Sequence, residues 1–170
     1  LTMGITDALA AIAAGNSVLI KPDQQTPFST IWAVALLEEA GLPPGVANVI
    51  TGEGSKLGEP IVDNVDYLMF TGSTEGGRLL SAQCAERLIE CSMELGGKNA
   101  MLVLPDAKLE KTVNGTLIAA FSSAGQLCIA MERIYVHRPI YEAFVDRLAE
   151  RLSQLKLGGD LGWGFDVGPL

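Results

Sequence analysis

The segment YLMFTGSTEGG, residues 67–77, contains the pattern that decides the fold. An apolar run at 67–70 predicts a buried strand, a turn rich in glycine follows it, and a helix is expected over about 75–87. Ser73 or Thr74 can cap this helix, and the free backbone N–H groups at its start can hold an anionic phosphate. A capped helix without a ligand is the alternative interpretation of the same residues.

The same order of strand, turn and helix recurs before this segment. Helices are predicted at 1–14, 27–40 and 55–62, and strands at 17–20 and 46–50. This alternation predicts an α/β fold with a Rossmann-type parallel sheet and helices on both of its faces. Ligands bind beyond the carboxyl ends of parallel strands, where the turns at Lys21, Gly52 and Gly72 are expected.

A second unit is predicted after the strand at 88–95. In that strand Ile89, Cys91 and Met93 alternate with polar residues, so Glu94 is expected on the polar side. Two glycines then break the strand. The next unit has predicted strands at 100–104 and 133–137, a helix at 109–124 and an amphipathic helix from Tyr141.

Composition excludes several classes of protein. Hydrophobic residues make up 48% of the 170-residue chain and the net charge is -8, which favours a globular protein and argues against a nucleic-acid partner. No apolar run reaches the ~20 residues of a membrane span. Three irregularly spaced cysteines argue against a disulfide framework or a metal site and suit a reducing cytoplasm. Both ends of the chain look cut, so a larger protein is expected.

Two features leave alternatives open. Gly52, Gly54 and Gly58 spell G-x-G-x-x-x-G, one residue longer than the dinucleotide fingerprint, and an ordinary turn explains them equally well. Cys128 follows small residues at the end of a predicted helix, where it is either a buried small hydrophobe or a reactive thiol. Cys84 and the thiol of the half-buried strand are interpreted as packing residues.

Six segments together resemble the aldehyde dehydrogenase superfamily, with succinate-semialdehyde dehydrogenases as the nearest type. They are AAGNSVLIKPDQQTP, GVANVITGEGSKLGE, FTGSTEGG, MELGGKNA, FSSAGQLCIAMERIYV and DVGPL. The resemblance covers almost the whole chain. It implies an aldehyde-dehydrogenase-like α/β fold, with residues 1–95 as part of the NAD(P)-binding domain and residues 96–170 as the first part of the catalytic domain.

The resemblance also implies roles for individual residues. Cys128 matches the nucleophile, Glu94 the general base, and Lys21 the lysine that binds the adenosine ribose. The positions implied to bind the cofactor are Lys21, Asp23, Gly54, Gly58, Phe70, Thr71, Gly72, Ser73, Leu95 and Gly96. No metal is implied. Asp23 would repel a 2′-phosphate, so NAD is expected in preference to NADP.

The implied chemistry requires a thiolate and a base. The Cys128 thiolate attacks an aldehyde, a hydride leaves for the nicotinamide, and Glu94 activates the water that hydrolyses the thioester. The family's oxyanion-hole asparagine and its ribose-binding glutamate are expected outside this chain. The fragment alone is therefore expected to be inactive, and the parent protein to be a homodimer or homotetramer.

Two other functions stay open at this point. The first is a dinucleotide-binding or structural module of the same fold without catalysis. The second is a cysteine hydrolase that pairs Cys128 with His137, the only histidine. Their spacing along the chain does not exclude contact.

Overall fold

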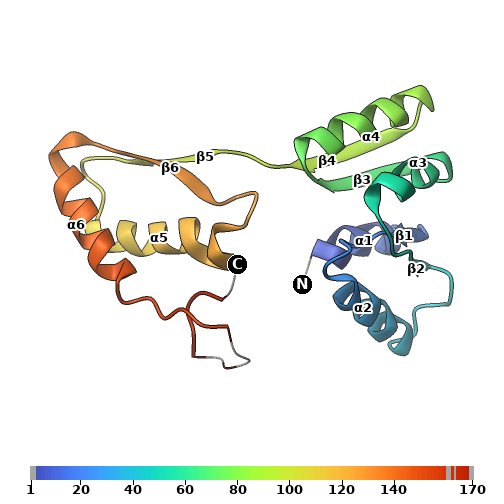
Figure 1. Cartoon of the computed structure of the whole chain (residues 1–170), viewed down its shortest axis with the longest axis horizontal. Helices are drawn as coiled ribbons and strands as arrows, with labels where there is room; N and C mark the ends of the chain where they lie inside the picture. Colours follow the sequence, from blue (N-terminus) through green and yellow to red (C-terminus); the bar gives the residue numbers. More distant parts are fainter. Residues whose placement is uncertain (1–2, 160–161, 163, 169–170) are drawn as a thin grey trace. The chain divides into compact units, whose positions relative to one another are not determined.

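The computed structural model describes residues 3–159, 162 and 164–168 (Figure 1). The chain divides into two compact units, residues 1–94 and 95–170. The first two residues of the helix expected from Leu1, and Pro169 and Leu170 of the DVGPL segment, lie outside the described residues. Within those residues, no helix has both the length and the apolar character needed to cross a membrane.

The first unit alternates helices and strands. Its elements are α1 (Met3–Ala13), β1 (Val18–Ile20), α2 (Pro27–Glu39), β2 (Ala47–Val49), α3 (Gly54–Asp63), β3 (Tyr67–Gly72), α4 (Thr74–Glu86) and β4 (Glu90–Leu95). β1 pairs with β2 in parallel, with Val18 opposite Ala47, and β3 pairs with β4. The predicted α/β class with parallel strands is confirmed.

Glycine ends the first two helices as the sequence predicts. Gly15 has a φ of 88°, in the left-handed region, and its N–H donates to the Ile12 carbonyl at 2.9 Å. Gly41 has a φ of 103° and its N–H donates to the Glu38 carbonyl at 3.0 Å. Glycine reaches this region without the Cβ penalty of other residues, so both stops are local properties of the sequence.

β3 is half-buried, which corrects the prediction of a buried strand. Tyr67 and Met69 are exposed, whereas Leu68 and Phe70 are partly buried. The side chains of a strand alternate between its two faces, and only one face of this strand is covered within the described residues of the unit.

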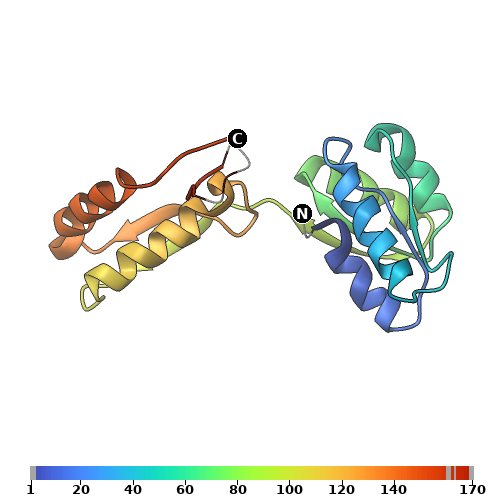
Figure 2. The same cartoon turned by 90° about the horizontal axis from the view of Figure 1, so that it is seen from below.

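The second unit is a parallel strand pair with two helices. It contains β5 (Asn99–Val103), α5 (Leu109–Phe121), the short 3₁₀ helix η1 (Ser122–Gly125), β6 (Met131–Val136), a second 3₁₀ turn (Arg138–Ile140) and α6 (Tyr141–Leu152). α5 and α6 lie along the same face of the β5–β6 pair (Figures 1 and 2). Val103, Val113 and Phe144 form the buried centre of this unit.

Some predicted boundaries were wrong by two or three residues. α5 stops at Phe121 because Ser123 and Ala124 take left-handed conformations, with φ of 51° and 57°. β4 starts at Glu90 because Leu88, with a φ of 57°, ends the preceding turn. β6 begins two residues earlier than predicted, at Met131.

Candidate functional site

Lys21 reaches from the end of β1 to the turn that follows β2. Its Nζ donates to the carbonyl oxygen of Pro22 at 2.8 Å and to that of Gly52 at 3.3 Å. β1 and β2 are parallel neighbours, so their carboxyl ends meet at one edge. A Cβ built at Gly54 would lie 3.8 Å from Lys21 Cε. The structure therefore places Lys21 against the turn that carries Gly54.

Asp23 shapes the turn between β1 and α2. Its Oδ1 accepts a hydrogen bond from the backbone N–H of Gln25 at 2.8 Å, and its carbonyl accepts one from Thr26 at 3.2 Å. This is the local bond by which Asp commonly stabilises a turn. The carboxylate is exposed and follows Lys21 by two residues, so the two charges lie on one short segment.

Gly58 has a packing explanation. It lies in α3, and a Cβ there would come within 3.3 Å of Leu80 Cδ2 on α4. α3 and α4 contact one another, and the glycine allows their close approach (Figure 1). This contact accounts for the third glycine of the G-x-G-x-x-x-G run without a ligand.

The Phe70 ring lies over the glycine-rich turn after β3. A Cβ at Gly72 would lie 2.5 Å from Phe70 Cζ, so a larger residue there would displace the ring. Ser73 caps α4, since its Oγ accepts the Gly76 N–H at 3.1 Å. Thr71 is exposed beside this turn. The predicted cap is confirmed, and the start of α4 has the polarity that attracts anions.

Glu94 is the penultimate residue of β4 and is exposed, on the side that the alternation predicts. Leu95 ends the strand half-buried, and Gly96 follows it exposed. Glu94 belongs to the first unit and Cys128 to the second.

Cys128 lies in the loop between η1 and β6 and is exposed. Its carbonyl oxygen accepts a hydrogen bond of 2.7 Å from Asn99 Nδ2, and the same nitrogen lies 3.1 Å from the Ala130 carbonyl oxygen. The sequence reasoning did not single out Asn99. The available signal was an amide side chain two positions after the second glycine of ELGGKN, at the start of a strand.

The other two thiols are packed. Cys84 is buried on α4, and Cys91 is half-buried on β4 with its Sγ 4.0 Å from Ser81 Oγ. Burial raises the pKa of the Cys84 thiol, and the neighbouring Cys91 raises it further. Both predictions of a packing role are confirmed. Cys128 is the one thiol of the three that is exposed.

The alternative pairing of Cys128 with His137 is wrong. Cys128 precedes β6 and His137 follows it, where its N–H donates to the Val103 carbonyl. β6 has six residues, which corresponds to about 20 Å of strand. A histidine at the far end of that strand cannot activate the thiol.

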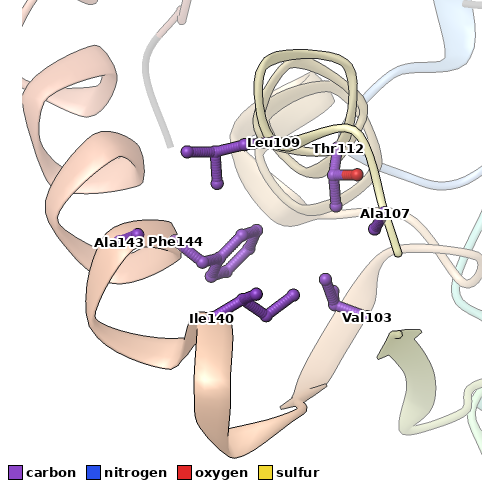
Figure 3. A pocket seen from close by; sticks show the side chains of 7 residues that line it. All are labelled: Val103, Ala107, Leu109, Thr112, Ile140, Ala143 and Phe144. Atoms are coloured by element: carbon purple, nitrogen blue, oxygen red, sulfur yellow. The ribbon is translucent and has the colours of Figure 1, made fainter. Parts of the chain in front are cut away.

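A small apolar cavity of about 60 Å³ lies in the core of the second unit (Figure 3). Its lining consists of Val103, Ala107, Leu109, Thr112, Ile140, Ala143 and Phe144. Val103 ends β5, whereas the Cys128 loop is bound to Asn99 at the beginning of the same strand. The cavity therefore lies at the other end of the strand pair and is a packing gap away from the thiol.

The described residues contain no group of three or more histidine, cysteine, aspartate or glutamate side chains that could hold a metal ion.

Comparison with known proteins identifies one family over the whole chain. The family model described as "Aldehyde dehydrogenase family" matches residues 1–170. A putative succinate-semialdehyde dehydrogenase [NADP(+)] of Mycolicibacterium smegmatis is 46% identical over 170 residues, which are 100% of this chain and 33% of that protein. The chain thus spans about a third of the length of this relative.

Solved structures give the same result. An NADP-dependent enzyme of E. coli has a TM-score of 0.91 at 42% identity, over 94% of this chain and 34% of that one. Betaine aldehyde dehydrogenase of Staphylococcus aureus, in complex with NAD+, has a TM-score of 0.90 at 35% identity, over 96% of this chain and 33% of that one.

Proposed function

The chain belongs to the aldehyde dehydrogenase family, and from that premise we propose that it is part of an enzyme that oxidises an aldehyde to a carboxylic acid with a nicotinamide dinucleotide. The observation that carries the proposal is the exposure of Cys128, in a chain whose other two thiols are packed. Succinate semialdehyde is the proposed substrate, because the Mycolicibacterium relative is named as a putative succinate-semialdehyde dehydrogenase.

The first and last of the three proposed steps are assigned to residues of this chain. The Cys128 thiolate adds to the carbonyl carbon and leaves an alkoxide on the former carbonyl oxygen. A dinucleotide, when bound, would accept the hydride from that carbon, and the alkoxide adduct would thereby become a thioester. Glu94 then takes a proton from water while the water oxygen attacks the thioester carbon. The carbon–sulfur bond breaks, the acid leaves, and the thiolate is restored, with the proton returned from Glu94 to solvent.

The residues around the strand ends fit a dinucleotide. The Lys21 ammonium is half-buried and bonded to two carbonyl oxygens, and it has no carboxylate partner within the described residues. It can therefore donate to ribose hydroxyl groups. Ser73 and the start of α4 suit the pyrophosphate. Leu95 and Gly96 are the residues proposed to lie beside the nicotinamide.

The proposal includes NAD in preference to NADP. Asp23 contributes a carboxylate two residues after Lys21, and that charge would repel a 2′-phosphate. The Mycolicibacterium relative and the E. coli enzyme are named for NADP, and the Staphylococcus enzyme was solved with NAD+.

We further propose that catalysis needs a longer polypeptide. The chain matches about a third of its relatives' length, so this segment alone should bind or react without full turnover. We also propose that the longer polypeptide forms a homodimer or homotetramer and that it is located in the cytoplasm. The three free cysteines are compatible with a reducing compartment.

The test uses the longer polypeptide with succinate semialdehyde and NAD. Cys128→Ser should abolish NADH formation. Glu94→Gln should retain a single burst of NADH and lose steady-state turnover, because acylation occurs and thioester hydrolysis does not. Cys91→Ser is the matched control and should keep its activity. Turnover by Cys128→Ser would overturn the proposal, and dinucleotide binding without turnover in any form would favour a non-catalytic module.

A further inference from the structure

The loop that carries Cys128 is tied to the start of β5 by one side chain. Asn99 Nδ2 has two hydrogens, and its two acceptors are the carbonyl oxygens of Cys128, at 2.7 Å, and Ala130, at 3.1 Å. Ala130 is buried, whereas Cys128 is exposed. One amide group thus joins the exposed thiol residue to a buried anchor two residues further on.

The backbone before Cys128 is strained. Ser123, Ala124 and Gly125 follow one another in the left-handed region, with φ of 51°, 57° and 74°. A residue with a side chain pays about 1–2 kcal/mol for that conformation. Such a segment persists only when its surroundings hold it in place.

The sheet beside the loop is irregular as well. Asn99 pairs with Met131 and the next residue, Ala100, pairs with Arg133, so β6 has one extra residue at Glu132. Bulges of this kind often lie next to active sites, where they change the direction of a side chain. Arg133 Nε donates to the Lys98 carbonyl at 2.9 Å, and Lys98 forms an ion pair with Glu132, so further contacts join the starts of the two strands.

The space for the Asn99 side chain depends on a glycine. A Cβ at Gly97 would lie 3.3 Å from Asn99 Oδ1 and 3.7 Å from the Cys128 carbonyl oxygen. The second glycine of the ELGG segment therefore leaves room for the contact between Asn99 and the Cys128 loop.

From these contacts we infer that Asn99 is a positioning residue for the Cys128 thiol. Its amide holds the peptide group that follows Cys128, and this constrains the direction of the Cα–Cβ bond from which the sulfur extends. The inference depends on the proposed role of Cys128 as the nucleophile. Asn99 touches no reacting atom, and its effect on the reaction passes through the loop.

The first experiment measures hydrogen exchange in the 170-residue chain. Asn99→Ala removes two hydrogen bonds from this loop, so exchange in residues 126–130 should become roughly thirtyfold faster. Peptides around Val113 and Phe144 should exchange as before. Asn48→Ala is the matched control, since Asn48 also donates to two backbone carbonyls, at Gly45 and Val18. Unchanged exchange in residues 126–130 would overturn the inference.

The second experiment measures steady-state kinetics in the longer polypeptide. Asn99→Ala should lower kcat about a hundredfold and leave KM for the aldehyde within a factor of three, because a misplaced nucleophile slows the chemical step. Asn48→Ala should retain kcat. Faster exchange with an unchanged kcat would refute the positioning role, and activity in Cys128→Ser would instead refute the proposed function.

A third measurement uses the wild-type chain, so it tests the inference even where Asn99→Ala fails to fold. In an NMR experiment, the two Asn99 side-chain amide protons should exchange with water at least tenfold more slowly than those of the exposed Asn114. Equal exchange of the two side chains would overturn the inference without any substitution.

Discussion

Lys21 Nζ lies 3.3 Å from the carbonyl oxygen of Gly52, so the ammonium at the end of β1 is held against the turn that follows β2. This relationship makes Lys21 testable as a binding residue. Lys21→Met should raise KM for the dinucleotide about tenfold and change kcat less than threefold, because contacts with the adenosine end are the same in the ground and transition states. Lys56→Met is the control, since Lys56 is exposed and paired with Glu53. An unchanged KM would contradict the assignment.

Asp23 should control the choice between NAD and NADP. In Asp23→Ser the carboxylate is gone, while a serine hydroxyl can still accept the Gln25 N–H that shapes the turn. The ratio of kcat/KM for NADP to that for NAD should rise about tenfold, which corresponds to about 1.4 kcal/mol of repulsion removed. The exposed Asp106→Ser should leave the ratio unchanged. A wild-type preference for NADP would refute the proposal.

Ser73 should stabilise the first unit through its cap. Ser73→Ala removes the acceptor of the Gly76 N–H and should lower the free energy of unfolding by about 1 kcal/mol in urea. Thr26 is at the same position of α2 and makes no side-chain cap bond, so Thr26→Ala should cost less than about 0.5 kcal/mol. Equal losses would show that the cap bond is not the cause.

Cys84 should make stability fall at alkaline pH. Its pKa is raised by burial above the ordinary value of 9.0, with a further increase from Cys91 and an opposing effect of Arg87. Below pH 9 the thiol is protonated in both the folded and the unfolded chain, so its contribution to the free energy of unfolding is complete. As pH rises through the raised pKa, the unfolded chain releases the proton first, so folding is disfavoured.

The measurement is the urea midpoint between pH 7.5 and 10.5. Cys84→Ala should have a flatter profile than the wild type, and the exposed Cys128→Ala should keep the wild-type slope. Parallel profiles for the wild type and Cys84→Ala would mean that the Cys84 thiol ionises equally in both states.

Phe144 should carry much of the stability of the second unit. It is 2% exposed and lies beside the apolar cavity, so Phe144→Ala should cost about 3–5 kcal/mol of unfolding free energy. Phe28 on α2 is 81% exposed, so Phe28→Ala is the matched control. It should lower the free energy of unfolding by less than about 0.5 kcal/mol. A small loss at Phe144 would mean that the surrounding side chains collapse into the space.

Local signals explain what could be predicted from the sequence. Gly15 and Gly41 ended their helices as expected, and Ser73 capped α4, because each feature depends on a few neighbouring residues. The approach of Lys21 to Gly54 followed from a general rule, since the carboxyl ends of adjacent parallel strands meet at one edge.

Tertiary contacts explain what could not be predicted. Ala124 is the best type of helix former, yet it is left-handed, and nothing in its neighbours along the chain indicates this. The amide of Asn99 bonds carbonyls that lie 29 and 31 residues further along the chain. Such a contact depends on the pairing of β5 with β6, so it becomes visible only in the structure.

The parallel pairing within each unit has a consequence for biosynthesis. Val18 cannot find its partner until Ala47 has been made, and Asn99 must wait for Met131, because parallel strands require a long crossover between them. Such distant pairings form slowly. The strand pair of the first unit is therefore complete in sequence while residues of the second unit are still being synthesised, and β5 has no strand partner until β6 follows.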